Sequence, residues 1–176
     1  LGLVGSEMCI RDRYEALERI AAHMNKTLEQ TKGYKSKLVI ENAAGQGTNV
    51  GIKFEEIQHI IDNIDDKKRI GVCIDTQHAW ASGYDWRNNF DNIWDNFDDT
   101  VGMEYLVALH LNDSKSELGS RVDRHDNIGM GKIGKEAFEK FMQEKRLEHL
   151  AAYLETPGGP EMWKPEIAAL RKLAEK

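Results

Sequence analysis

Short apolar runs alternate along the chain with longer stretches in which apolar residues recur at helical spacing. Each apolar run ends on a carboxylate or a histidine, and the four runs cover residues 38–41, 70–75, 106–110 and 150–155. Apolar residues three or four positions apart mark residues 14–28, 54–64, 90–101, 137–141 and 163–173. This pattern predicts helices and strands in the order α-β-α-β-α-β-α-β-α. Such strict alternation is typical of right-handed crossover units in a parallel sheet.

Four strand–helix units amount to half of an eight-stranded barrel, which typically takes about 250 residues. An open doubly wound sheet is the alternative, but residues 42–47 lack the G-x-G-x-x-G spacing of a dinucleotide-binding turn. We therefore expect an α/β fold of the TIM (β/α)8-barrel type, here a partial barrel of about four βα units preceded by a helix. The loop at residues 112–132 is long, polar and glycine-rich, and loops of that length are often functional.

The composition is that of one globular domain. The 176 residues are 40% hydrophobic, and no run approaches the roughly 18 apolar residues of a membrane span. The net charge of −6 argues against binding nucleic acid through an overall positive field, although a local basic patch remains compatible with it. The two cysteines, Cys9 and Cys73, form no disulfide framework, which fits a reducing, cytoplasmic location.

The first thirteen residues differ from the rest of the chain. They contain no initiator methionine and show no helical or strand period, and their apolar stretch is too interrupted for a signal peptide. They resemble the spurious translated ends of fragmentary reading frames. We expect residues 1–13 to be a non-native or disordered segment and the native sequence, a C-terminal piece of a longer protein, to begin near Tyr14.

The ends of the predicted strands carry candidate metal ligands. Parallel strands end on one face of a sheet, so four side chains should converge there: Glu41, Asp75, His110 and Glu155. His78 follows three residues after Asp75, and the long loop contains the pair Asp123 and His125. Converging acids and imidazoles need a counter-charge, which a metal ion supplies. Nitrogen and oxygen ligands without thiolate suit Zn²⁺, Mn²⁺ or Fe²⁺, and several histidines favour zinc.

These seven candidate ligands exceed the capacity of one tetrahedral site, so at least two metal ions are implied. Clustered metal ions are a common device for phosphoester hydrolysis, because they activate a water, polarise the phosphorus centre and neutralise the leaving oxygen. The remaining histidines, His23, His59 and His149, lie in helical or surface contexts, and we expect them to be structural.

Five segments carry the motifs of a known family. They are LVIENAAGQG at 38–47, GVCIDTQHA at 71–79, HLNDSK at 110–115, GSRVDRH at 119–125 and LET at 154–156. Together they resemble the signatures of the endonuclease IV (deoxyribonuclease IV) family of apurinic/apyrimidinic endonucleases. The resemblance implies a zinc-dependent, xylose-isomerase-like TIM barrel that cleaves double-stranded DNA 5′ to an abasic site and leaves a 3′-hydroxyl. Residues 14–176 would be the C-terminal half of this domain, and the full-length protein would be a monomer.

The resemblance also implies roles for individual residues. Glu41 and Glu155 would be catalytic, with Glu41 bridging two zinc ions and holding the hydrolytic water. The metal ligands would be Glu41, Asp75, His78, His110, Asp123, His125 and Glu155. Within this set, the third zinc would be held by His78, Asp123 and His125. The residues that approach DNA would be Gly45, Gln46, Lys115, Arg121 and Arg124.

The chain departs from the family pattern in its metal sites. The complete enzyme binds three zinc ions, and the first of them needs two histidines from the N-terminal half that nothing before Tyr14 offers. At most about two sites are then complete in this chain, with Mn²⁺ a possible substitute for zinc. Two alternatives stay open. One is a metal-dependent sugar isomerase or epimerase of the same superfamily, which would not need the loop with Asp123 and His125. The other is an inactive metal-binding fragment.

Overall fold

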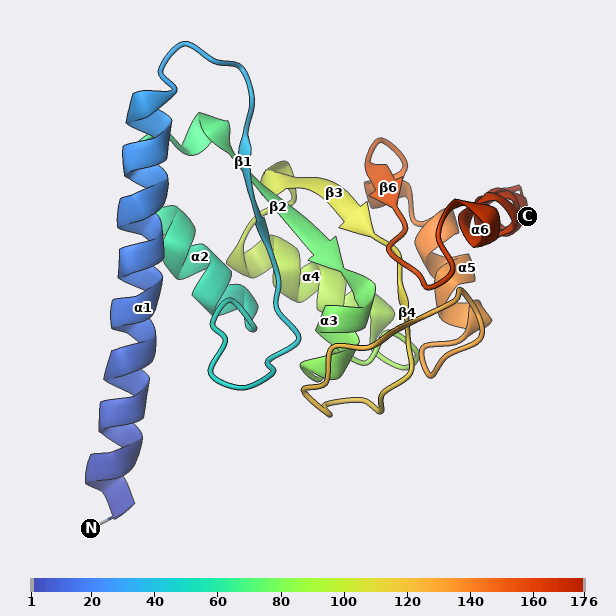
Figure 1. Cartoon of the computed structure of the whole chain (residues 1–176), viewed down its shortest axis with the longest axis horizontal. Helices are drawn as coiled ribbons and strands as arrows, with labels where there is room; N and C mark the ends of the chain where they lie inside the picture. The colour runs from blue at the N-terminus through green and yellow to red at the C-terminus, as the bar shows by residue number, and fades with distance from the viewer. Residues whose placement is uncertain (1, 176) are drawn as a thin grey trace.

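A parallel sheet of four strands forms the centre of the computed structural model, which describes residues 2–175, with their side chains from Asp12 onward (Figure 1). The strands are β1 (Leu38–Glu41), β2 (Ile70–Asp75), β3 (Leu106–His110) and β6 (Ala151–Tyr153). They lie in the order β1-β2-β3-β6, and every neighbouring pair is parallel. Strands that follow one another in space as they do in sequence are the arrangement of a barrel wall, whereas a doubly wound sheet reverses its order. The predicted partial barrel is confirmed.

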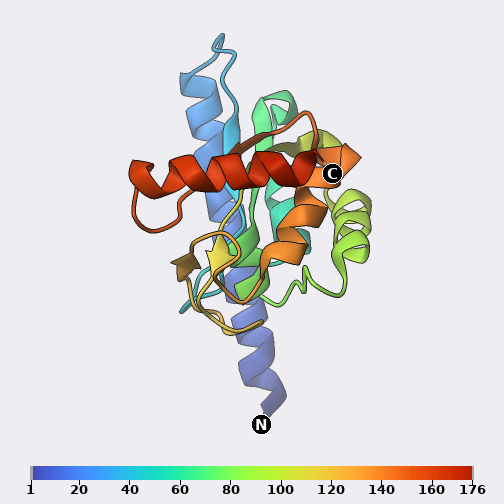
Figure 2. The ribbon, with the colours of Figure 1, turned by 90° about the vertical axis from the view of Figure 1, so that its right-hand side faces the viewer.

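Five longer helices accompany the strands in the predicted alternation. They are α1 (Gly2–Gln30), α2 (Phe54–Asp62), α4 (Phe90–Thr100), α5 (Lys135–Gln143) and α6 (Pro160–Ala174). Figures 1 and 2 show α1 and α6 at opposite ends of the sheet. Alternate strand residues such as Ile40 and Val72 are buried in the same apolar cluster as the helices, whereas Val39, on the other face of β1, is 48% exposed. The helices therefore cover one face of the sheet.

The first helix begins earlier than the sequence pattern indicated. Helix α1 starts at Gly2, although residues 1–13 showed no helical period. Within the part whose side chains are described, Arg13 pairs with Glu56 of α2, with Arg13 Nε donating to Glu56 Oε1 at 3.0 Å. The assignment of residues 1–13 as a non-native or disordered segment stays a prediction.

Several short elements were not predicted. Helix α3 (Thr76–Ala81) directly follows β2, and the long loop contains an antiparallel pair, β4 (Asp113–Ser114) and β5 (His125–Asp126). Three 3₁₀ turns precede strands β2, β3 and β6: Lys67–Arg69, Met103–Tyr105 and Lys145–Leu147. Asp75 begins α3, because its carboxylate accepts a hydrogen bond from His78 N at 2.8 Å. Both α3 and the β4–β5 pair bring loop residues to the strand ends.

Strands β1 and β6 are the two edges of the sheet. All three residues of β6 are exposed, including Tyr153 at 55%. An apolar groove of about 780 Å³ runs between α1 and β1 and is lined by residues such as Ile20, Met24 and Val39. Both edges of this parallel sheet are thus open among the described residues, as expected where a barrel wall is incomplete. No helix in residues 2–175 has both the length and the apolar character needed to cross a membrane.

Candidate metal centre

The strand ends bring one group of candidate ligands together. Glu41 ends β1, Asp75 ends β2, His110 ends β3, and Glu155 lies two residues after β6. One donor atom from each of the four lies within 4.8 Å of all the others. The Nδ1 atom of His110 is 3.1 Å from Glu41 Oε1 and 3.2 Å from Glu155 Oε2. This geometry follows from the parallel register, in which Asp75 and His110 are direct neighbours.

A second group adjoins the first and shares Asp75 with it. Donor atoms of Asp75, His78 and His125 also lie within 4.8 Å of one another. The Asp123 carboxylate is 3.5 Å from the Nε2 atoms of both His78 and His125. His78 comes from α3 and His125 from β5, so the two unpredicted elements supply the imidazoles of this group. The structure thus places all seven predicted ligands in one continuous cluster.

Backbone carbonyls set the orientation of two imidazoles. His78 Nδ1 lies 2.9 Å from the carbonyl oxygen of Asn42, and His125 Nδ1 lies 3.2 Å from that of Glu155. A carbonyl can only accept, so each Nδ1 donates and the neutral ring keeps its lone pair on Nε2. The Nε2 atom of His125 is buried and has no hydrogen-bond partner among the described residues. An orphaned nitrogen that faces carboxylates is what a metal site requires, so the residues present fit a divalent cation.

The charges of the cluster also favour a cation. Burial opposes ionisation of Glu41, but hydrogen bonds from His110 and His78 outweigh it and lower the pKa of Glu41 to about 2. The Cys73 thiol and Glu41 raise the pKa of His110 to about 11. Burial works against the charged form of His78, yet Glu41 and other carboxylates raise its pKa to about 9. The carboxylates thus strongly favour positive charge on the neighbouring histidines. A metal ion can supply that positive charge in place of the protons on the imidazoles.

A groove of about 610 Å³ opens beside the cluster, lined by Glu41, His78 and Asp123 and by two of the residues expected to approach DNA, Gln46 and Arg124. Gln46 Oε1 accepts a hydrogen bond from Asp123 N at 3.2 Å, and Arg124 Nη1 donates to the carbonyl of Asp123 at 2.7 Å. The loop after β1 and the long loop therefore meet at the mouth of this groove.

The other three residues expected at DNA lie outside the groove lining. Lys115 and Arg121 are exposed. Arg121 has a left-handed φ of 57°, and its backbone N–H donates to the carbonyl of Ala81 at 2.9 Å. Gly45 is buried beneath this arginine, since a Cβ added to Gly45 would lie 3.4 Å from Arg121 Cγ and 3.3 Å from Ile52 Cδ1. Gly45 thus supports the loop and does not present surface to a ligand.

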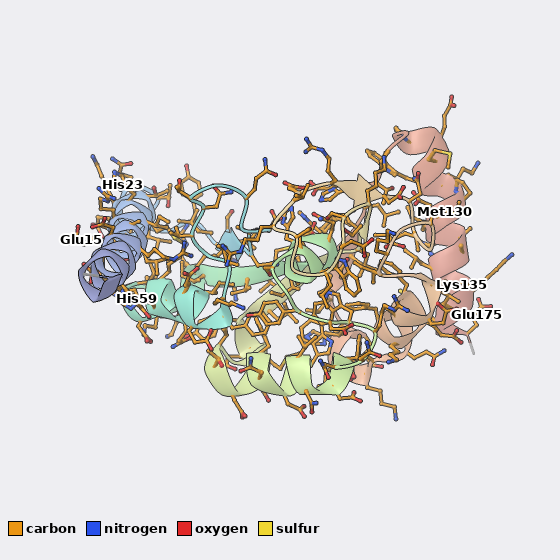
Figure 3. All side chains as sticks on the ribbon, turned by 90° about the horizontal axis from the view of Figure 1, so that it is seen from below. Glu15, His23, His59, Met130, Lys135 and Glu175 are labelled. Carbon is orange, nitrogen blue, oxygen red and sulfur yellow. The ribbon has the colours of Figure 1, made fainter. Side chains whose placement is uncertain are left out.

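The predicted structural histidines lie elsewhere. Figure 3 shows His23 and His59 at the α1 end of the molecule. The ring of His59 packs edge-on against Tyr14 with centroids 4.8 Å apart, and its Nε2 is 3.8 Å from Glu18. His149 is exposed. All three are outside the candidate ligand groups of the described residues.

Two buried asparagines of the cluster were not singled out from the sequence. Asn42 accepts from Asp75 N at 2.7 Å and donates to the carbonyl of Asp75 at 3.2 Å, and Asn112 donates to the Asp75 carboxylate at 2.6 Å. Both stand within two residues of a predicted strand end. The sequence signal that could have identified them is an asparagine just after a strand that ends in a metal ligand, because buried metal ligands need polar hydrogen-bond partners.

Comparison with known proteins agrees with this architecture. A family model described as the xylose isomerase-like TIM barrel matches residues 3–173. The chain belongs to the xylose isomerase-like TIM-barrel family.

Two similar proteins are named as endonucleases. Over 157 residues the chain is 50% identical to "Probable endonuclease 4" of Phocaeicola vulgatus, a match that covers 89% of this chain and 55% of that protein. The crystal structure of endonuclease IV from Thermus thermophilus superposes with a TM-score of 0.79 at 38% identity, covering 90% of this chain and 58% of that one. The endonuclease IV resemblance of the motifs is confirmed. The chain spans little more than half the length of either relative.

Proposed function

We propose that this chain carries the main part of the metal centre of a zinc-dependent endonuclease that hydrolyses DNA 5′ to abasic sites. The observation that carries the proposal is the pair of ligand groups joined at Asp75, on a chain similar to proteins named endonuclease 4 and endonuclease IV. Because the chain spans just over half of those relatives, the activity is proposed for the whole protein, to which this chain contributes its strand-end acids and histidines.

Zinc is the metal that the donor set suits best. The two groups together offer His78, His110 and His125 with carboxylates and no thiolate. Such ligands bind zinc well and accept manganese as a substitute. When bound, zinc supplies Lewis-acid polarisation of a phosphate and acidification of the attacking water. At most about two sites would be complete in this chain, one at each candidate group, and a third would need ligands from outside it.

Glu41 and Glu155 are suited to contact water or substrate. Their side chains are 38% and 50% exposed, whereas Asp75 is fully buried. The pKa of about 2 keeps Glu41 ionised at neutral pH, so it can accept a hydrogen bond from an attacking water but cannot act as an acid. His110 lies between the two glutamates and holds both carboxylates toward the cluster.

The groove beside the cluster is the proposed path of the DNA backbone. Arg124 and Gln46 can donate hydrogen bonds to phosphate oxygens there. Arg121 and Lys115 are exposed on the same long loop and add positive charge. With a net charge of −6, attraction to DNA must come from this local patch. Contacts of this kind recognise backbone shape rather than base sequence.

The test is whether this chain cleaves a labelled DNA duplex that contains one abasic site. We expect zinc-dependent cleavage that leaves a 3′ end extendable by a DNA polymerase, with no cleavage of the intact duplex. The substitution Glu41→Gln should reduce the rate by about 100-fold or more, because it removes a ligand charge. Glu161→Gln, at an exposed glutamate of α6, is the matched control and should leave the rate unchanged.

Cleavage that persists without zinc, or that survives Glu41→Gln, would contradict the proposal. Zinc binding by this chain without cleavage would restrict its role to that of a metal-binding part. The sugar isomerase alternative is less well supported, because Asp123 and His125 join the same cluster beside Arg124.

A further inference from the structure

We infer that Asn112 is the positioning residue of the metal centre, because its side-chain amide ties the shared ligand Asp75 to the backbone of Glu155. The inference rests on the proposed function and adds to it a residue that holds no metal itself. Asn112 is fully buried and lies two residues beyond His110, the last residue of β3.

Both ends of the Asn112 amide are in use. Its Nδ2 donates to Asp75 Oδ2 at 2.6 Å, and its Oδ1 accepts from the backbone N–H of Glu155 at 2.8 Å. One side chain therefore connects the end of β2 with the segment after β6, across β3. Strand pairing through β3 brings Asp75, His110 and Tyr153 to the same edge of the sheet, and Glu155 lies two residues beyond Tyr153, the last paired residue of β6. The amide therefore ties Glu155 to Asp75 where strand pairing has ended.

The oxygen that Asn112 holds is the one shared by the two ligand groups. Asp75 Oδ2 is 3.8 Å from His110 Nδ1 and 3.7 Å from His125 Nε2. The other oxygen, Oδ1, is held by the backbone N–H of His78 at 2.8 Å. Rotation of the Asp75 carboxylate is thereby blocked at both oxygens. Oδ2 keeps a further lone pair directed toward the histidines.

Only an amide satisfies both neighbours. An aspartate at position 112 would place a second negative charge against Asp75 Oδ2, and an apolar residue would leave Oδ2 and the N–H of Glu155 without this partner. Thr76 adds to the rigidity, because its hydroxyl donates to the carbonyl of Asn112 at 2.7 Å and accepts from its N–H at 2.9 Å. The backbone of Asn112 is therefore fixed before any ligand arrives.

The experiment is a titration of the full chain with Co²⁺, followed by its visible absorption, with Zn²⁺ displacement to obtain the zinc affinity. Asn112→Ala should weaken binding at both groups by about 10–100-fold, because Asp75 serves both. Asn112→Ser, whose short hydroxyl cannot reach both neighbours, should weaken it similarly and provides a second variant if the alanine form does not fold. Circular dichroism establishes that each variant is folded at the temperature of the titration.

The matched control is Asn25→Ala. Asn25 likewise donates and accepts across two segments, to the carbonyl of Asn63 at 2.9 Å and from Asp65 N at 3.0 Å, but it lies on α1, away from the cluster. The Asn25→Ala variant should have a lower free energy of unfolding, but its Co²⁺ affinity and its Co²⁺ absorption spectrum should not change.

The outcomes separate the inference from the proposed function. Weaker binding and an altered Co²⁺ spectrum in folded Asn112 variants, with normal binding by Asn25→Ala, support the positioning role. Normal Co²⁺ affinity in the Asn112 variants overturns it and leaves the proposed metal centre intact. Absence of Co²⁺ binding by the unsubstituted chain overturns the metal centre and the positioning role together.

Discussion

At the scale of single residues, the sequence alone indicated which side chains at the strand ends could bind a metal ion, before their positions in space were known. Glu41, Asp75, His110 and Glu155 stand out because an ionisable group at the end of an apolar strand is costly to bury without a partner. The hydrogen-bond partners of these ligands could not be identified from the sequence in the same way. Asn42 and Asn112 are ordinary polar residues in the sequence, and only the contacts with Asp75 reveal their part in the cluster.

One prediction for a single residue concerns Glu56, which orders the loop after β1. Its carboxylate accepts from the N–H groups of Gly51 and Ile52 at 2.9 and 2.8 Å. Burial raises the pKa of Glu56, but the bonds from Arg13 and Ile52 outweigh this, and the pKa is lowered. A lowered pKa stabilises the fold above the unfolded value of about 4.5, and this contribution is lost as the pH falls through the folded pKa.

Glu56→Gln should therefore cost about 1 kcal/mol of unfolding free energy at neutral pH, with the difference from the unsubstituted chain shrinking below about pH 4.5. Urea unfolding at a series of pH values measures this. Glu55→Gln, at the exposed neighbour on the same helix, serves as the control. A difference that grows toward low pH would refute the assignment.

At the level of elements, the long loop owes its shape to one buried carboxylate. Asp113 accepts from the N–H groups of Ser114, Gly129, Gly131 and Ile133 at 2.7–3.0 Å. A Cβ added to Gly131 would lie 2.5 Å from the carbonyl oxygen of Ser114, so the loop also needs glycine at that approach. These bonds hold the segment that follows β5 against β4 and so fix the strand that carries His125.

Asp113→Ala should lower the free energy of unfolding by about 3 kcal/mol, because several buried N–H groups lose their acceptor together. It should also weaken metal binding at the group that includes His125 more than at the group that includes His110. Thermal unfolding and Co²⁺ titration measure the two effects. Asp99→Ala, at an exposed position on α4, is the matched control. Equal loss at both groups would show that the loop does not act through His125.

In the molecule as a whole, the sheet is open at both edges among the described residues and is held at one end by a charged cluster. The strands approach each other there with four carboxylates and three histidines in contact. A divalent cation that binds only the folded chain stabilises it by mass action. The metal centre should thus contribute to the stability of the entire partial barrel.

Zinc at about 100 times its dissociation constant should add about 2.7 kcal/mol per site and raise the midpoint of thermal unfolding by roughly 5–10 °C. Chelation should reverse the shift, and differential scanning calorimetry measures it. Magnesium, which disfavours imidazole ligands, should produce no comparable shift. Asp75→Asn should abolish the zinc effect, since Asp75 belongs to both groups. An undiminished shift in that variant would place the metal elsewhere.

The amino-acid pattern was enough to establish the alternation of strands and helices, the parallel sheet and the convergence of its four terminal ligands. Local periodicity sets these features, because the burial of one face fixes each element and the handedness of crossovers fixes their order. The motif resemblance had already grouped Asp123 and His125 with His78, but the three-dimensional fold was needed for the short helix α3, the β4–β5 pair and the hydrogen bonds from two asparagines to Asp75. Those features depend on hydrogen bonds between segments more than thirty residues apart, such as Asn112 with Asp75 and Gln77 with Val122. A local sequence pattern does not predict such pairings, because the two residues come within hydrogen-bond distance only after the segments between them have folded.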